Sequence, residues 1–292
     1  NFKGLVDEGW RYKIEGNIES TEDIEFDLDK GIFITGSIKA GGWIKAGDSI
    51  KAGGWIKAGG SIEAGSWIEA GDSITAGDSI TAGYSIKADS WIKAGGWIKA
   101  DSWIKAGGSI EAGESIKAGD SIEASYSIEA GGWIKAGGSI EAGSWIEAGD
   151  SITAGGSIEA DSWIKADSWI KAGDSIEASY SIKAGSWIEA GYSIEAGDSI
   201  KAGGSIEADS WIKAGDSIEA GYSIEAGYSI TAGLYISCKR VLKFGLKVFA
   251  GICTWREISE EEKTITCGKF EGGVIECGIL KERGLPATGK KQ

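Results

Sequence analysis

The side chains that could do chemistry in this 292-residue chain are few in kind. The chain contains no histidine and four cysteines, and its net charge at neutral pH is −14. Histidine is the commonest general base and a frequent metal ligand, so proton transfer and metal binding lack their usual residue. No nucleophile is paired with a base, and no metal ligands cluster along the chain. We therefore expect a protein that is not an enzyme and that holds neither a metal nor a cofactor.

The four cysteines, Cys238, Cys253, Cys267 and Cys277, all lie near the C-terminal end. Their separations of 15, 14 and 10 residues differ from the paired spacing that is typical of zinc sites. Buried free thiols in a cytoplasmic protein are the favoured interpretation. One or two disulfides would instead indicate an oxidising compartment.

The charged and aromatic side chains lie on a repeat of six residues. From Ser37 to Leu234 the chain consists of 33 consecutive hexads, each reading Ser or Trp, Ile, a variable residue, Ala, usually Gly, and a second variable residue. Ile and Ala are invariant, whereas the residue between them is Lys in 15 hexads, Glu in 14 and Thr in four. This alternation predicts a very short strand that directs Ile and Ala inward and the charged residue outward.

The residue after Ala is predicted to form a corner. It is Gly in 26 of the 33 hexads, and Gly reaches positive φ without steric cost. Three strands and three corners close a triangle, so each coil takes three hexads and the 33 hexads form 11 coils. Stacked coils bury the apolar faces that no single coil could bury alone. The sequence thus predicts an all-β, triangular, parallel β-solenoid with about 18 residues per coil, and a left-handed coil is favoured.

Other folds conflict with the composition. A helix would carry one or two glycines in nearly every hexad, each costing about 1 kcal/mol relative to Ala. Collagen needs abundant proline, and this chain has Pro286 alone. A disordered Gly/Ser linker would not keep Ile invariant every six residues.

The repeat resembles that of the hexapeptide-repeat β-helix family, in which an aliphatic residue recurs every six residues and three hexads form each coil. The resemblance covers residues 37–234 and implies the fold. It does not imply the acyltransferase or carbonic-anhydrase-like activity of that family, because those enzymes use a histidine. The Ser-Ile-Lys-Ala-Gly and Ser-Ile-Glu-Ala-Gly units, together with residues 249–255, are also similar to uncharacterised repeat proteins of Gram-positive bacteria and their phages. This second resemblance implies no activity.

The two ends lack the strict repeat. Residues 1–36 are predicted to form an N-terminal cap, and residues 235–292 a C-terminal β cap and tail, around the solenoid domain of residues 37–234. Ile18 and Ile24 are six residues apart, so the first coil is expected to begin there in a degraded form. Residues 235–255 alternate and predict longer strands. Residues 264–270 and 274–280 flank Glu271-Gly272-Gly273 and predict a hairpin.

The last residues carry a short motif. Leu285-Pro286-Ala287-Thr288-Gly289 resembles the sortase recognition motif of Gram-positive surface proteins, which is followed in that family by a hydrophobic span and a basic tail. Only Lys290, Lys291 and Gln292 follow here. No apolar run approaches the roughly 20 residues that a membrane helix needs. We expect a cytoplasmic location, and a cell-surface location if the motif belongs to a sorting signal.

Twelve hexads begin with Trp, and the residue before each of these Trp is always Gly or Ser. A dozen outward indoles are typical of a binding surface, and the alternative is that each indole lies flat over the neighbouring coil. Side chains three hexads apart should stack, because they lie one coil above the other. Among the tryptophans this spacing is met by Trp145 with Trp163 and by Trp169 with Trp187, and these four are the candidate aromatic contacts.

The charged position forms columns at the same spacing. One column holds five successive glutamates: Glu123, Glu141, Glu159, Glu177 and Glu195. Like charges on adjacent strands are mildly destabilising, so the column is a candidate contact surface, and its five carboxylates could recruit a hard cation such as Ca²⁺ through oxygen ligands. The alternative is that the long side chains splay into water and that the column records duplication of hexads.

The charge of the repeat bears on the class of partner. Its 15 Lys face 14 Glu, 13 Asp and Glu114. This excess of negative charge argues against direct binding to nucleic acid or to an anionic membrane. We expect a non-catalytic, rod-like binding or scaffold protein with a protein partner, and self-association of rods is a further expectation. The alternative is a phage-type acidic inhibitor that mimics nucleic acid and blocks a DNA- or RNA-binding protein.

Overall fold

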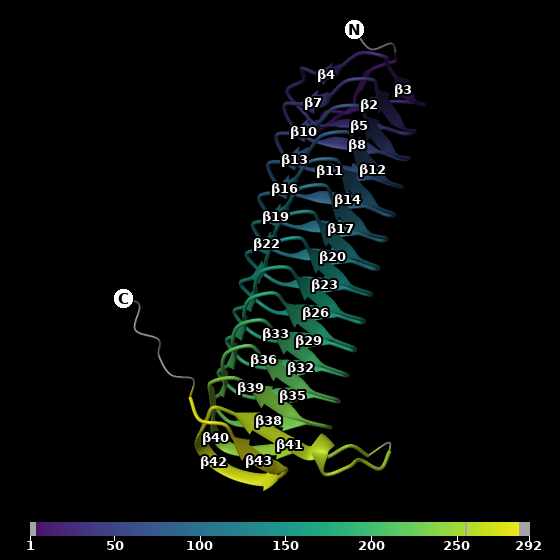
Figure 1. Ribbon diagram of the computed structural model, residues 1–292. Coiled ribbons are helices and arrows are strands. Elements are labelled where there is room, and N and C mark those ends of the chain that lie inside the picture. Colours follow the sequence, from purple (N-terminus) through teal and green to yellow (C-terminus); the bar gives the residue numbers. More distant parts are fainter. Residues whose placement is uncertain (1–3, 255, 286–292) are drawn as a thin grey trace, which may run out of the picture. The chain divides into compact units, whose positions relative to one another are not determined.

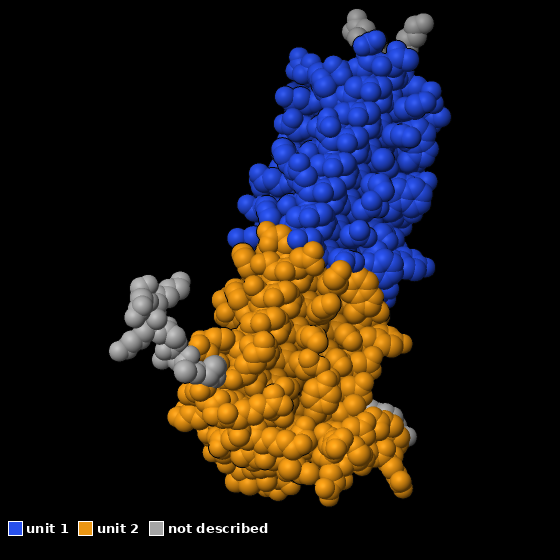
Figure 2. Space-filling model, in the orientation of Figure 1, with its two compact units in different colours: residues 1–149 blue, residues 150–292 orange. Residues whose placement is uncertain are grey.

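The computed structural model describes residues 4–254 and 256–285. These residues form a parallel β-solenoid in which the backbone returns over itself every three hexads along the repeat (Figure 1). Two compact units make up the chain, residues 1–149 and residues 150–292, and Figure 2 colours them separately. The predicted all-β, parallel β-solenoid with about 18 residues per coil is confirmed.

Each hexad before the last supplies one three-residue strand that covers Ile, the variable residue and Ala. In unit 1 these strands run from β6 (Ile38–Ala40) to β24 (Ile146–Ala148), and in unit 2 from β25 (Ile152–Ala154) to β37 (Ile224–Ala226), one every six residues. The last hexad forms the longer β38 (Ser229–Ala232). Strands pair in parallel and in register, as where Ile62, Glu63 and Ala64 lie opposite Ile80, Thr81 and Ala82.

Three faces follow from this pairing, and they are named here by sequence spacing. Face A holds the strands that begin at Ile44 or at a multiple of three hexads from it, such as β7 (Ile44–Ala46) and β31 (Ile188–Ala190). Face B is defined in the same way from Ile50, and face C from Ile38. Each coil therefore contributes one strand to each face.

The core is the column of Ile and Ala side chains that all three faces direct inward. Every Ile of the 33 hexads is at most 1% exposed, and every Ala is at most 7% exposed. Burial of an Ile side chain contributes about 1.5–3 kcal/mol, and here it depends on the coils above and below. The residue between Ile and Ala is never buried, so the chemistry of the faces is independent of the core.

The corners differ from the prediction in their backbone geometry. No described residue between positions 17 and 250 has a positive φ, so the corner glycines are not there for left-handed backbone. They allow close approach instead, because a Cβ on Gly119 would lie 2.0 Å from the carbonyl oxygen of Asp101, one coil earlier. The amide of Gly119 donates a hydrogen bond to the carbonyl of Ala100 at 3.1 Å. The seven hexads with Asp or Ser at this position imply a local adjustment of those turns.

Coiling begins before the strict repeat. The strands of the first turn are β2 (Tyr12–Ile14), β3 (Ile18–Glu19) and β4 (Ile24–Phe26), and β5 (Ile32–Ile34), which pairs with β2, begins the next turn. Ile18 pairs with Ile38 and Ile24 with Ile44, so this turn is longer than three hexads by two residues. The two extra residues lie between β4 and β5, whose first residues are eight apart. A short strand, β1 (Val6–Asp7), pairs antiparallel with β2.

Coiling also continues past the repeat. The elements are β39 (Ile236–Cys238), β40 (Val241–Ala250), the 3₁₀ turn η1 (Glu261–Lys263), β41 (Thr264–Cys267), β42 (Lys269–Cys277) and β43 (Ile279–Glu282). The ten-residue β40 confirms the longer strand, and it pairs in parallel with both β37 and β38. Face C has eight strands in unit 1 and seven in unit 2. The turns therefore outnumber the 11 predicted.

The predicted hairpin around Glu271-Gly272-Gly273 is wrong. These residues lie inside β42, which pairs in parallel with β40, and β41 pairs in parallel with β43. Gly272 has a φ of 149°, and a Cβ there would lie 2.1 Å from the carbonyl oxygen of Phe244. The two glycines thus carry the strand round a corner of the coil and do not reverse it.

Candidate interaction surfaces

Some tryptophans of the repeat are exposed, and others are partly covered by neighbouring coils. Five are exposed, by 36–50%: Trp43, Trp91, Trp97, Trp133 and Trp169. The other seven are half-buried, Trp145, Trp163 and Trp187 among them. The indoles therefore cover part of the neighbouring coils and still present apolar surface to solvent.

The predicted stack of Trp169 on Trp187 is present in unit 2. The ring centroids are 5.6 Å apart and the ring planes differ by 5°. The ammonium nitrogen of Lys171 lies 6.0 Å from the ring centroid of Trp187. Trp145 belongs to unit 1 and Trp163 to unit 2, so their stacking stays a prediction.

Hollows between aromatic side chains are the most distinct feature of the faces. They form where a coil with serine at the first position of its hexad lies between two coils that carry aromatic rings, and we call them aromatic slots. On face A of unit 1, Ser115 separates Trp97 from Trp133, and the slot between them has a volume of ≈ 290 Å³. Lys99, Lys117 and Glu114 also line this slot.

A second slot lies on face B of unit 1, where Ser85 separates Trp67 from Trp103. Its volume is ≈ 140 Å³, and Glu69 and Lys87 contribute charges of both signs to its lining. The hydroxyl of Ser85 is buried and has no hydrogen-bond partner within the described part of the chain.

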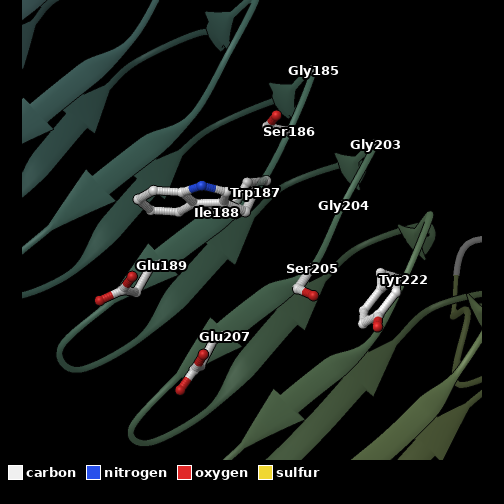
Figure 3. A pocket seen from close by; sticks show the side chains of 10 residues that line it. All are labelled: Gly185, Ser186, Trp187, Ile188, Glu189, Gly203, Gly204, Ser205, Glu207 and Tyr222. Atoms are coloured by element: carbon white, nitrogen blue, oxygen red, sulfur yellow. The ribbon is translucent and has the colours of Figure 1, made fainter.

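The largest of these three slots lies on face A of unit 2. Its volume is ≈ 430 Å³, and Gly204 and Ser205 form the small coil between Trp187 and Tyr222 (Figure 3). Glu189 and Glu207 are the charged side chains of its lining. The charges around the three slots thus range from mainly positive through mixed to negative.

Both aromatic rings of the Trp187/Tyr222 slot are supported from outside. Trp169, one coil before Trp187, stacks on that indole. The guanidinium of Arg240, one coil after Tyr222, lies over the phenol ring at 4.3 Å from the centroid. These groups lie beyond the slot on either side, and both rings line it together with Gly204 and Ser205.

The carboxylates of this slot belong to a run of three glutamates on face A. Glu189 pairs with Lys171 at 2.6 Å, and Glu225 forms an ion pair with Lys243. Glu207 lies between Glu189 and Glu225, and no cation of the described chain lies within ion-pairing distance of it. Although the residue as a whole is exposed, partial burial of its carboxyl group, followed by the charges of Glu225 and Glu189, raises the pKa of Glu207.

The predicted glutamate column lies on face B. Glu123 is opposite Glu141 in unit 1, and Glu177 is opposite both Glu159 and Glu195 in unit 2. Each run ends at a lysine: the ammonium of Lys105 lies 2.5 Å from a carboxylate oxygen of Glu123, and Lys213 forms an ion pair with Glu195.

Ion pairs of this kind form where the sign of the charge changes along a column. Further examples join Lys51 to Glu69, Lys93 to Glu111 and Lys201 to Glu219. Within the described ranges, no group of three or more His, Cys, Asp or Glu side chains is arranged to hold a metal ion. The column therefore offers carboxylates in line and not a coordination cluster.

The four cysteines are unpaired thiols. Cys238 and Cys267 are buried, and Cys238 lies opposite Ala220 in the inward-facing column. Burial is the main cause that raises the pKa of Cys238 to about 12 and that of Cys267 to about 11. Cys253 and Cys277 are half-buried. Of the sortase-like motif only Leu285 is described, and residues 286–289 lie outside the described residues.

Sequence reasoning missed the slots and with them Tyr222, Glu207 and Arg240. It compared side chains three hexads apart, which are direct neighbours on a face. The signal for a slot is a pair of aromatic residues 35 or 36 positions apart with a serine coil between them, as for Trp97 and Trp133.

Comparison with known proteins adds no assignment, because no family model matches the chain and neither the curated proteins nor the solved structures give a match. Within residues 4–254 and 256–285, no helix combines the length and the hydrophobicity needed to cross a membrane.

Proposed function

We propose that this is a non-catalytic binding or scaffold protein that holds a protein partner through the outward aromatic and charged side chains of its solenoid faces. The observation that carries the proposal is the aromatic slot, which recurs in both units with different charges around it. Several slots along one repetitive chain suit a partner that makes several contacts at once.

The origin and location of the protein are part of the proposal. The hexad and the segment that follows it support a place among the hexapeptide-repeat proteins and, more closely, among the Ser-Ile-Lys/Glu-Ala-Gly repeat proteins of Gram-positive bacteria and their phages. We propose a cytoplasmic location, with the cell surface as the alternative if residues 285–289 belong to a sorting signal.

The test is capture of partners from a Gram-positive lysate with the full chain as bait. Trp97→Ser and Trp187→Ser each remove one wall of a slot, and Ser is the other natural residue at that position of the hexad, so both variants should fold. We expect a captured protein that survives washing with high salt and is lost with one or both variants. Trp43→Ser is the control, because Trp43 lines none of the three slots. Capture that is unaffected by the slot variants would contradict the proposal.

The alternative function is mimicry of nucleic acid by an acidic solenoid. The excess of negative charge in the repeat favours it, and the lysine–glutamate ion pairs along the columns oppose it, because they neutralise part of that charge. In the same experiment, mimicry predicts a DNA- or RNA-binding protein that is released by salt and insensitive to the tryptophan variants.

A further inference from the structure

The Trp187/Tyr222 slot is built differently from the other two. The charged side chains of its lining are all acidic, and Tyr222 is the one other ionisable residue there. Lysines line the Trp97/Trp133 and Trp67/Trp103 slots. We propose that this slot binds an organic cation, an alkylammonium or guanidinium group, between the indole of Trp187 and the phenol of Tyr222. This inference deepens the proposed function, on which it rests, by naming the chemistry of one contact.

The dimensions of the slot suit such a group. Parallel strands are about 4.8 Å apart, so the coils of Trp187 and Tyr222 are separated by about 10 Å across the coil of Gly204. A cationic head midway is then about 5 Å from the level of each coil, so a ring that leans into the slot from either coil can come within the roughly 6 Å of its centroid at which ammonium and guanidinium groups bind aromatic faces. Gly203, Gly204 and Ser205 leave this space free of bulky side chains (Figure 3).

The molecule already places a cation on the outer side of each ring. Lys171 approaches Trp187 from the coil before it, and Arg240 covers Tyr222 from the coil after it. The outer side of Trp187 therefore holds both the stacked indole of Trp169 and the ammonium of Lys171, and the outer side of Tyr222 holds a guanidinium. A cation bound in the slot would repeat, on the inner side of the two rings, the cation–aromatic contact that both rings already make on the outer side.

The carboxylates select the charge of the ligand. Glu207 lies in the slot without a partner cation among the described residues, between two glutamates that are already paired. An anion would be repelled. A neutral ring would stack but leave the charge of Glu207 uncompensated, whereas a cation gains both the ring faces and the carboxylate.

The experiment is a titration of the full chain, with tryptophan indoles labelled with ¹⁵N and the ionic strength held constant. The probes are choline, an arginine-containing peptide, and 3,3-dimethyl-1-butanol, which has the shape of choline without its charge. We expect choline and the peptide to shift the Trp187 indole signal saturably, and the neutral analogue to bind at least tenfold more weakly. A peptide that binds at least tenfold more tightly than choline would assign the cation to a protein partner, and the reverse order would assign it to a small molecule.

Two variants and one control locate the binding. Ser205→Trp fills the slot, and the sequence Gly-Trp already occurs at Gly132-Trp133, so this variant should fold and lose binding at least tenfold. Glu207→Gln should weaken binding about fivefold or more. Glu129→Gln removes the same charge on face C, outside the slot and the glutamate column, and should leave binding unchanged.

The inference is overturned if neither cation shifts Trp187, if the neutral analogue binds equally well, or if Ser205→Trp still binds. In each of these cases partner capture that depends on Trp97 would leave the proposed function standing. Conversely, cation binding without any slot-dependent capture would overturn the proposed function and leave this site in place.

Discussion

Two glutamates of unit 2 occupy the same position of the hexad in opposite surroundings. Glu219 accepts a hydrogen bond from the hydroxyl of Tyr235 and pairs with Lys201 at 2.9 Å, and these contacts hold its pKa below the ordinary value despite partial burial. Partial burial of its carboxyl group, together with Glu225 and Glu189 on either side of it in the same column, raises the pKa of Glu207. The position in the hexad thus determines that a charged side chain points outward, whereas its neighbours determine whether its charge stabilises or destabilises the fold.

Substitution of these two glutamates should change stability in opposite directions. Because the folded-state pKa of Glu207 is raised, its charge destabilises the fold above that pKa, so Glu207→Gln should raise the thermal midpoint at pH 7 by about 1–2 °C. The gain should vanish below pH 4.5, the ordinary pKa of glutamate. Glu219→Gln should lower the midpoint at pH 7, and this loss should fade as the pH falls from 4.5 through the lowered pKa. Thermal unfolding at pH 7 and pH 4 measures both, and changes of the same sign at pH 7 would contradict the assignment.

The cysteines should differ in reactivity. The thiolate is the reactive form, and thiols with pKa values of about 12 and about 11 hold almost none of it at pH 8. We expect iodoacetamide to alkylate Cys253 and Cys277 in the folded protein well before Cys238 and Cys267, as followed by peptide mass spectrometry. In denaturant all four should react at similar rates. Early labelling of Cys238 in the native protein would show that this part of the coil opens.

Within each strand, the inward-facing Ile and Ala contribute most of the stability. Ile116→Ala removes most of a side chain that is fully buried, so it should lower the free energy of unfolding by about 2–5 kcal/mol. Lys117→Ala, on the next residue of the same strand, should change it by less than about 0.5 kcal/mol, because that side chain faces water. Chemical denaturation followed by circular dichroism gives both values. A comparable loss from Lys117→Ala would mean that the faces contribute to stability as much as the core.

The elements show how far the sequence determines the fold. Strand positions, register and core follow from the invariant Ile and Ala, because only one arrangement buries every one of them. The corner geometry did not follow, because Gly is compatible with positive φ and with close packing alike, and only the carbonyl of the preceding coil, as at Gly119, distinguishes the two. The hairpin at Gly272 failed for a related reason, since a pair of glycines serves a bend within a strand as well as a reversal.

The candidate site was predictable only in part. The stack of Trp169 on Trp187 follows from a spacing of three hexads and is present. The Trp187/Tyr222 slot depends on what the intervening coil lacks, and on partners such as Arg240 that lie outside the strict repeat. Empty space of this kind is a property of three successive coils and not of any one hexad.

At the scale of whole coils, the hexads are interchangeable as folding elements but not as surfaces. Deletion of residues 193–198 or of residues 193–210 within unit 2 leaves the order of hexads intact, so both variants should keep their circular dichroism and thermal midpoint within a few degrees. Both should lose choline binding, because the first moves Tyr222 to another face and the second places it in the coil next to Trp187. Deletion of residues 193–195 breaks a hexad and should lower the midpoint much further. Equal midpoints for all three deletions would contradict the equivalence of hexads.

The equivalence of the three sides has a consequence for how such a gene can change. Gain or loss of six codons costs the folded chain little, yet it turns every later side chain by a third of a revolution against the earlier ones. A recombination slip within the repeat therefore re-sorts aromatic and charged residues into new neighbours in one event, while the hydrophobic interior is preserved. New combinations of surface side chains can therefore arise in this molecule without any amino-acid substitution.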